Sequence, residues 1–253
     1  MEKALSGGNT HEEVVRVDDT VRRPTGPWTP GVHALLVHLR QRGFDGAPRV
    51  HGVDEQGREV LDYVEGEVVY PEHVHWLASD AALAEVASVI RRFHDAASSF
   101  TESRTYVWSD RGSDPAGPDE ILCHNDLAPW NLVRSSEGRW VFIDWDLAAP
   151  GRRSWDLAWA LLSFVPLLPD SNLDDVRTRH RIAVFRSSYG VGEFPDDVVS
   201  VAVERCRRET DLIHRLGATG EMPYARLLAE GHGGIWSAAA THISSRASHW
   251  DVS

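Results

Sequence analysis

The pattern of hydrophobic and polar positions changes near residue 66, from segments typical of β-strands to segments typical of α-helices. Before that point, short runs rich in β-branched residues are separated by turn residues. One helical segment interrupts them, because Thr29 is expected to cap a helix that continues to about Gln41 with apolar residues at helical spacing. The predicted strands cover residues 14–17, 20–23, 49–53 and 59–64.

After residue 66 the apolar positions recur mainly at helical spacing. Ser79 and Asp80 are expected to begin one helix, and Asp156 begins another that Pro166 ends. Further helices are predicted over residues 172–189, from about 199 until Gly217 ends the helix, and about 223–244, the last interrupted by glycines. Short strands are predicted over residues 121–123, 132–134 and 139–143. The sequence therefore predicts an α+β chain, with a small β-rich lobe at residues 1–66 and a larger, mainly helical lobe at residues 67–253.

The densest group of polar residues lies in the middle of the chain, within and after the run Cys123–Asn131. His124 and Asp126 form a His-x-Asp loop, Asn131 follows that aspartate by five residues, and Asp144 lies thirteen residues beyond the asparagine. The short strands on either side are expected to bring these side chains together. Phosphoryl transfer uses this set of groups, because one carboxylate orients the attacking hydroxyl while an amide and a second carboxylate hold magnesium.

These residues resemble the aminoglycoside phosphotransferase family, through its H-x-D-x-x-x-x-N loop and its I-D-[WF]-[DE] strand. The run Gly151–Ala158 is similar to the family's downstream G-x-x-x-x-D-L-A element, so the resemblance is dense over residues 121–159. It implies a bilobal protein-kinase-like fold that uses ATP or GTP, together with Mg²⁺. The chain is also similar to a subgroup of which some members are labelled as immunity proteins for peptide toxins.

The resemblance also implies a role for each residue of the group. Asp126 would orient the acceptor hydroxyl, and Asn131 and Asp144 would coordinate magnesium. His124 would pack under the loop and fix it. Asp146 would reach a second ion or the substrate, or else face away, and Asp156 would hydrogen-bond the backbone of the catalytic loop.

On the nucleotide side, the sequence both matches and departs from the kinase pattern. Gly7 and Gly8 lie in a small loop whose backbone N–H groups are candidates for phosphate binding, although a plain turn would look the same. The usual strand lysine is absent, and Arg22 is the predicted substitute, with Arg23 on the opposite face as the alternate. No acidic residue occurs in the helix that should supply its glutamate partner. The backbone near Tyr63 and Val64 is expected to bind a purine.

Composition narrows the class of ligand. A formal charge of −12 argues against nucleic acid as a partner and is compatible with a cationic small-molecule substrate. Only two cysteines are present, which suits a reducing cytoplasm, and no stretch is apolar enough for a membrane span or a secretory signal. The chain is expected to be a monomer or a homodimer.

Two functions compete on this sequence. The first is a small-molecule kinase that transfers the γ-phosphoryl group to a hydroxyl of an aminoglycoside or a similar cationic, hydroxylated metabolite, which would make the protein an antibiotic-resistance enzyme. The alternative is a binding or immunity protein that keeps the kinase fold with little or no transferase activity. The missing lysine and glutamate favour the alternative, whereas the intact Asp126, Asn131 and Asp144 favour the kinase.

Overall fold

The computed structural model describes residues 2–5, 14–114 and 120–250. These residues form two compact units, each described by itself below. The first unit comprises Met1–Trp76 with Ser88–Arg152, and the second comprises Leu77–Ala87 with Arg153–Ser253.

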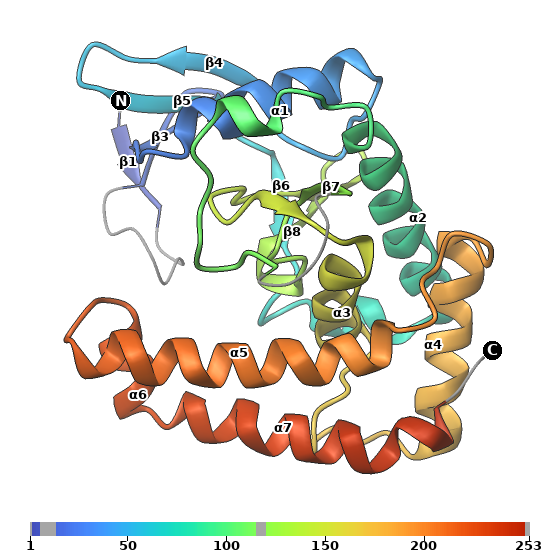
Figure 1. Cartoon of the computed structure of the whole chain (residues 1–253). Helices are drawn as coiled ribbons and strands as arrows, with labels where there is room; N and C mark the ends of the chain where they lie inside the picture. Colours follow the sequence, from blue (N-terminus) through green and yellow to red (C-terminus); the bar gives the residue numbers. More distant parts are fainter. Residues whose placement is uncertain (1, 6–13, 115–119, 251–253) are drawn as a thin grey trace. The chain divides into compact units, whose positions relative to one another are not determined.

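A five-stranded antiparallel sheet forms one part of the first unit (Figure 1). Its strands, in spatial order, are β1 (Glu2–Ala4), β2 (Val15–Val17), β3 (Thr20–Pro24), β5 (Arg58–Asp62) and β4 (Val50–Val53). The four strands predicted before residue 66 are thus confirmed within one or two residues at each end. The outer strand β1 was not predicted, because three exposed residues carry no hydrophobic alternation.

Helix α1 (Thr29–Gln41) lies in the connection between β3 and β4 and has the predicted length. Its apolar face is fully buried at Val32, Leu35, Leu36 and Leu39. The predicted capping role of Thr29 is wrong, because the helix already includes this residue and Trp28 precedes it as N-cap. The Thr29 hydroxyl instead accepts a hydrogen bond from the backbone N–H of Gly26 (2.9 Å), which fixes the turn that leads into the helix.

The central part of the sequence supplies two further small sheets to the same unit. One joins β6 (Gly66–Val68), β8 (Leu132–Ser135) and β9 (Trp140–Phe142), and the other pairs β7 (Ile121–Cys123) with β10 (Ala149–Gly151). In the second half of α2 (Asp80–Ala97), Phe93 packs edge-on against Trp145, which lies between β9 and β10. This region also contains 3₁₀ turns at Val74–Ala78, Ser103–Thr105 and Pro129–Asn131. The last two residues of the first turn, Leu77 and Ala78, are counted in the second unit.

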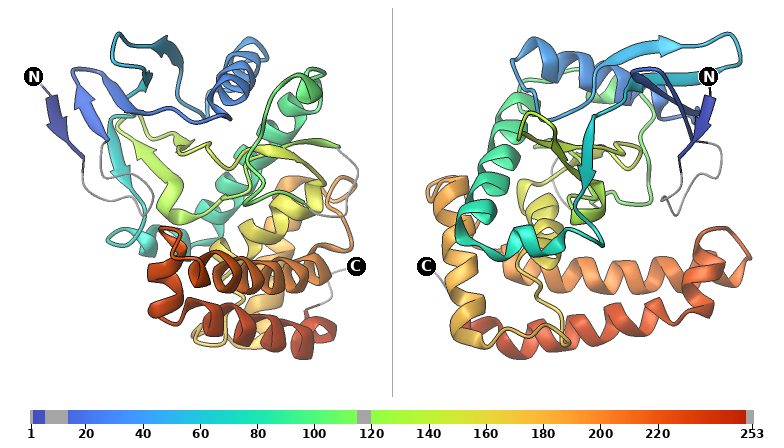
Figure 2. Two further views of the ribbon diagram at one scale, coloured as in Figure 1. Left: turned by 60° about the vertical axis from the view of Figure 1, so that its left-hand side comes forward. Right: turned by 180° about the vertical axis from the view of Figure 1, so that it is seen from behind.

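Helices make up the second unit. Besides the first turns of α2, they are α3 (Arg153–Phe164), α4 (Asp175–Tyr189), α5 (Val198–Ala218), α6 (Tyr224–Ala229) and α7 (His232–Arg246), followed by a 3₁₀ turn at Ala247–His249. Helices α5 and α7 run side by side in every view (Figure 2). The predicted last helix is two helices, because Gly231 adopts a left-handed conformation (φ 82°) that ends one and begins the next.

The boundary predicted after residue 66 stays a prediction. Strand β6 begins at Gly66 and pairs with β8, so the residues of the phosphoryl-transfer pattern belong to the same compact unit as the N-terminal sheet. Among the helices described, none combines the length and the apolar character that crossing a bilayer requires.

Candidate active site

The loop that follows strand β7 is fixed by a buried histidine. His124 is fully buried, and its Nε2 donates a hydrogen bond to the carbonyl of Ile143 (3.2 Å). Its Nδ1 accepts a weaker one from the backbone N–H of Asp126 (3.3 Å). Asn125 between them adopts a left-handed conformation (φ 67°), which asparagine tolerates better than most residues. The imidazole therefore joins the Asp126 loop to the segment that carries Asp144.

Asp126 is oriented by two side chains that come from the short turn after it. Its Oδ2 accepts hydrogen bonds from Asn131 Nδ2 (2.7 Å) and from Trp130 Nε1 (3.1 Å). Asn131 Nδ2 also donates to the Asp126 carbonyl (3.1 Å), so that the amide spans the whole loop. The contact of Trp130 could not be predicted from the sequence, since an indole inside the H-x-D-x-x-x-x-N pattern carries no chemical signal of its own.

Asp144 follows strand β9 and is held in a left-handed conformation (φ 60°). The preceding residue, Ile143, donates its backbone N–H to the carbonyl of Asn131 (2.9 Å), which brings the two predicted magnesium ligands to neighbouring strands. The Asp144 side chain is 39% exposed, so that its carboxylate can meet a ligand from solvent. A non-glycine residue in this conformation is strained, and such residues persist where the surrounding contacts over-determine them.

A buried arginine forms ion pairs with Asp144 and with the nearby Asp146. Arg23, on strand β3, places Nη1 2.9 Å from Asp144 Oδ1 and Nη2 2.7 Å from Asp146 Oδ1. Burial disfavours its charge, but the carboxylates of Asp146, Asp144 and Glu59 outweigh that effect and raise the pKa of Arg23. Asp146 is therefore turned inward to the arginine.

The structure brings Arg23, and not Arg22, to the candidate site. Arg22 lies on the opposite face of β3, where its Nη1 donates to the Thr20 hydroxyl and its Nε lies 3.6 Å from Asp54 Oδ2. The alternation along the strand is as predicted, but it is the alternate arginine that faces the carboxylates. The assignment of Arg22 to phosphate binding receives no support from this placement.

Two residues that the sequence analysis did not place in the site complete the arginine's surroundings. Glu59 on strand β5 is 1% exposed and forms an ion pair through Oε1 with Nε of Arg23. Its other oxygen, Oε2, accepts from Nε2 of His33 on α1 (3.0 Å). A continuous row of polar contacts thus runs from α1 through two strands to Asp144.

The predicted purine-binding segment follows β5. The backbone N–H of Tyr63 donates to the carbonyl of Asp19 (2.8 Å) and is therefore already used, so the carbonyl of Tyr63 and the backbone of Val64 are what remain of that prediction. The guanidinium of Arg16 stacks on the Tyr63 ring (3.7 Å) and pairs with Glu65 (2.9 Å).

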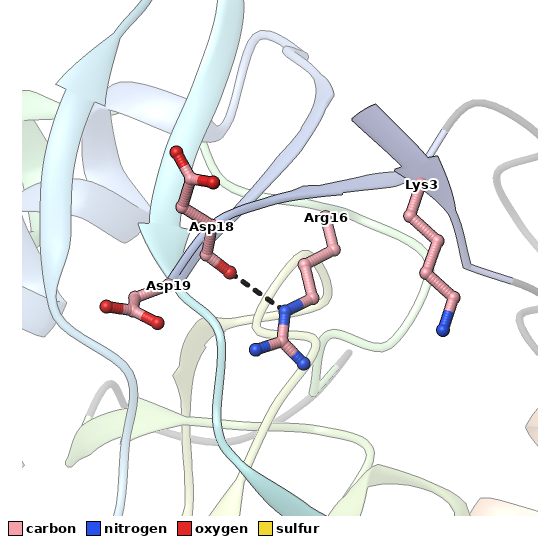
Figure 3. Close-up of a pocket in the computed structure, with 4 residues that line it drawn as sticks. All are labelled: Lys3, Arg16, Asp18 and Asp19. Atoms are coloured by element: carbon pink, nitrogen blue, oxygen red, sulfur yellow. Dashed lines mark hydrogen bonds between the residues drawn. The ribbon is translucent and has the colours of Figure 1, made fainter. Parts of the chain in front are cut away.

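Beside this segment lies an open pocket of about 480 Å³ lined by Lys3, Arg16, Asp18 and Asp19 (Figure 3). Nε of Arg16 donates to the Asp18 carbonyl there (2.8 Å). Lys3 and Arg16 are cross-strand partners, and Arg16 is the partner of Val21. Arg23 follows Val21 by two residues on the same strand. The side chains of Lys3, Arg16 and Arg23 therefore project from the same face of the sheet. Gly7 and Gly8 lie outside the described residues.

Asp156 is fully buried in the first turn of α3, in the other compact unit. The predicted hydrogen bonding of its carboxylate to the catalytic loop stays a prediction. Both cysteines, Cys123 and Cys206, are buried free thiols.

The donor set suits magnesium. Within the described ranges no three or more His, Cys, Asp or Glu side chains gather in a geometry that would hold a metal by themselves. Mg²⁺ does not need such a cluster, since it usually takes one or two protein oxygens and completes its shell with water and substrate phosphates. Asn131 donates through its nitrogen to Asp126, which turns the amide oxygen the other way, and Asp144 keeps an exposed carboxylate.

Comparisons with known proteins find relatives of this chain. A model described as the phosphotransferase enzyme family matches residues 107–189, which include all four residues of the His124–Asp144 pattern. The trifolitoxin immunity protein of Rhizobium leguminosarum bv. trifolii is 35% identical over 216 residues, which cover 80% of this chain and 81% of that protein.

Solved structures show the same fold at low identity. An aminoglycoside phosphotransferase from Alicyclobacillus acidocaldarius superposes with a TM-score of 0.57 at 16% identity, over 98% of this chain and 92% of that one. A spectinomycin phosphotransferase in complex with ADP and spectinomycin gives a TM-score of 0.62 at 10% identity, over 96% of this chain and 88% of that one. The α+β protein-kinase-like fold predicted from the sequence is thereby confirmed. The chain belongs to the phosphotransferase enzyme family, together with the trifolitoxin immunity protein.

Proposed function

We propose that this protein transfers the γ-phosphoryl group of ATP or GTP to a hydroxyl group of a small cationic molecule, an aminoglycoside or a similar hydroxylated metabolite. One observation carries the proposal: Asp126, Asn131 and Asp144 lie in one hydrogen-bonded arrangement beside a buried cation. Phosphoryl transfer depends almost entirely on positioning and on electrostatic stabilisation, which is what such an arrangement supplies.

Each residue has a distinct role in this proposal. Asp126 accepts a hydrogen bond from the acceptor hydroxyl and aims it at the phosphorus, and Asn131 and Trp130 keep the carboxylate in place. Strong basicity of Asp126 is unnecessary where the transition state is loose. Asn131 and Asp144 would hold Mg²⁺, which when bound neutralises charge on the nucleotide phosphates.

Arg23 is the residue that we assign to the place of the kinase lysine. It is a buried cation that pairs with Asp144, and a guanidinium can donate two parallel hydrogen bonds to phosphate oxygens. Backbone groups at Tyr63 and Val64 would meet the base. The acidic character of the chain supports a cationic acceptor, since a negatively charged surface raises the local concentration of such molecules.

The test is release of ADP or GDP by the purified protein, in the presence of Mg²⁺, against a panel of aminoglycosides and other amino-sugars. We expect acceptor-stimulated release that Asp126→Ala abolishes. Asp95→Ala is the matched control, because Asp95 is an exposed acid whose partner is Arg91 on the surface of α2. Full turnover by Asp126→Ala would refute the assignment.

A second function, sequestration of a toxin without phosphoryl transfer, is favoured by one specific finding. The relative at 35% identity bears the name of an immunity protein, and both chains match over four fifths of their lengths. The two functions can be separated in cells that express either this protein or its Asp126→Ala variant and are exposed to a peptide toxin against which the protein protects. Protection that survives Asp126→Ala indicates binding alone, whereas protection that Asp126→Ala removes indicates the transferase.

A further inference from the structure

Helix α1 lacks the acidic residue that would position the strand cation in a kinase, and the structure offers a replacement from elsewhere. We propose that Glu59 on strand β5, supported by His33 on α1, positions the guanidinium of Arg23 for nucleotide binding. In kinases the corresponding pair joins the strand lysine to a glutamate on the helix. The inference rests on the proposed function, because it assigns positioning residues to the nucleotide side of that same site.

The sheet register places Glu59 where this role requires it. Arg23 and Glu59 are direct cross-strand partners in the antiparallel pair β3–β5, so their side chains project from the same face at short range. Arg23 is 6% exposed and Glu59 is 1% exposed, which leaves little solvent to screen the charges. Both oxygens of Glu59 are occupied, one by Arg23 and the other by His33, so the carboxylate has one orientation.

That orientation decides where the arginine points. A guanidinium is a rigid planar fork, so holding Nε on one edge directs Nη1 and Nη2 to the opposite side. In the structure these two nitrogens face Asp144 and Asp146. Glu59 therefore sets the direction of the cation toward the carboxylate that would hold the metal–nucleotide complex.

His33 gives α1 a connection to the same group. It lies in the first turns of the helix, next to the buried Val32, and its Nε2 reaches Glu59 Oε2 at 3.0 Å. The side chain is mostly buried but keeps some exposure, as expected of a residue at the border of the apolar face. Helix α1 is thus joined to Arg23 through an intermediate carboxylate rather than by a glutamate of its own.

The experiment compares Glu59→Gln and His33→Gln with the unchanged protein, and measures the Kd of Mg²⁺–ATP and Mg²⁺–GTP by calorimetry without any acceptor. Gln at position 59 keeps the shape but loses the charge, and we expect a Kd about 10- to 100-fold higher. His33→Gln alters a contact to Glu59 and not to Arg23 itself, so it should raise the Kd less, about 2- to 10-fold. In turnover assays the KM of the nucleotide should rise while the KM of the acceptor stays unchanged.

The matched control is His51→Gln. His51 makes the same kind of contact, Nε2 to Asp62 Oδ1 at 2.7 Å, in the same sheet but in an exposed position away from Arg23. We expect no change in nucleotide affinity from it. The double variant His33→Glu/Glu59→Gln moves the carboxylate onto α1 and should recover part of the affinity that Glu59→Gln loses, which a residue needed only for folding would not do.

The outcomes separate this inference from the proposed function. Weakened nucleotide binding in both single variants supports the inference even where no acceptor is turned over. Turnover together with nucleotide Kd values within twofold of the unchanged protein overturns the inference and leaves the kinase in place. If Glu59→Gln does not fold, the nucleotide Kd of His33→Gln decides the outcome alone. If the unchanged protein binds no nucleotide, both the inference and the proposed function are overturned.

Discussion

Replacing Arg23 by methionine should destabilise the first compact unit strongly. Methionine fills a similar volume without charge, so the substitution removes the cation and leaves its three acidic partners in place. Of these, Glu59 is 1% exposed, and its carboxylate contacts Arg23 and His33 in the described part of the chain. An uncompensated carboxylate in such a place must lose its charge or draw in water.

The magnitude follows from the burial of the pair. Removing one partner of a buried ion pair costs about 3–5 kcal/mol, because the remaining charge stays desolvated. Asp144 adds little to this figure, since its side chain is 39% exposed and solvent screens it. Arg22→Met, which removes an arginine from the more exposed face of the same strand, should cost about 1 kcal/mol or less.

Urea denaturation monitored by circular dichroism measures these free energies of unfolding. The double variant Arg23→Met/Glu59→Met is the internal check, because replacing both members of a buried pair by apolar residues is often neutral or stabilising. We therefore expect the double variant to be more stable than Arg23→Met. If Arg23→Met unfolds at the same urea concentration as the unchanged protein, or if the double variant is the least stable of the set, the buried-charge reasoning is refuted.

Three further predictions concern other parts of the structure. Trp130→Phe removes the indole N–H that contacts Asp126 Oδ2 at 3.1 Å, so kcat should fall about 2- to 10-fold with the nucleotide KM unchanged in steady-state assays. Burial raises the pKa of Cys206 to about 12, so iodoacetamide should alkylate it only slowly at pH 8 in the native protein and rapidly in urea, as followed by mass spectrometry. Burial tends to raise the pKa of Asp175, but hydrogen bonds from His249, Trp250 and Arg246 outweigh it and lower that pKa. The stabilisation is then present above the ordinary aspartate pKa of about 3.9 and is lost as the pH falls through the lower folded value. Hydrogen exchange of residues 247–250 should accordingly stay slow at pH 5, and should be faster there in Asp175→Asn.

The sequence was most informative where chemistry and secondary structure coincide. The His-x-Asp loop and the strand ending at Asp144 could be predicted because both the spacing of the polar residues and the apolar strands beside them are local features. The helices of the second unit followed from periodicity for the same reason, although α3 begins at Arg153 and α4 at Asp175, each three residues from the predicted start. The predicted interruption of the last helix occurs at Gly231, the one of three nearby glycines that the sequence did not single out.

The choice between Arg22 and Arg23 could not be made in this way. Alternation along β3 showed that the two arginines face opposite sides, but not which side would be buried, because strand Thr20–Pro24 has no clear apolar face. The deciding contact is with β5, which follows β3 only after α1 and β4. Glu59, an acid next to the apolar Val60 and Leu61, was the available signal, and it becomes meaningful only once the register with Arg23 is known.

The cost of this buried charge network bears on the choice between the two functions. Buried ion pairs are weak sources of stability, and well-packed apolar residues of similar volume commonly do better. A protein whose fold served only to bind a toxin would gain nothing from placing Arg23 among Glu59, Asp144 and Asp146. Three carboxylates around one guanidinium also leave an excess of negative charge at Asp144, where a divalent cation would need it. The network therefore adds little stability to a protein that only binds a toxin, whereas it would help to hold a metal–nucleotide complex. This favours the kinase over the binding protein.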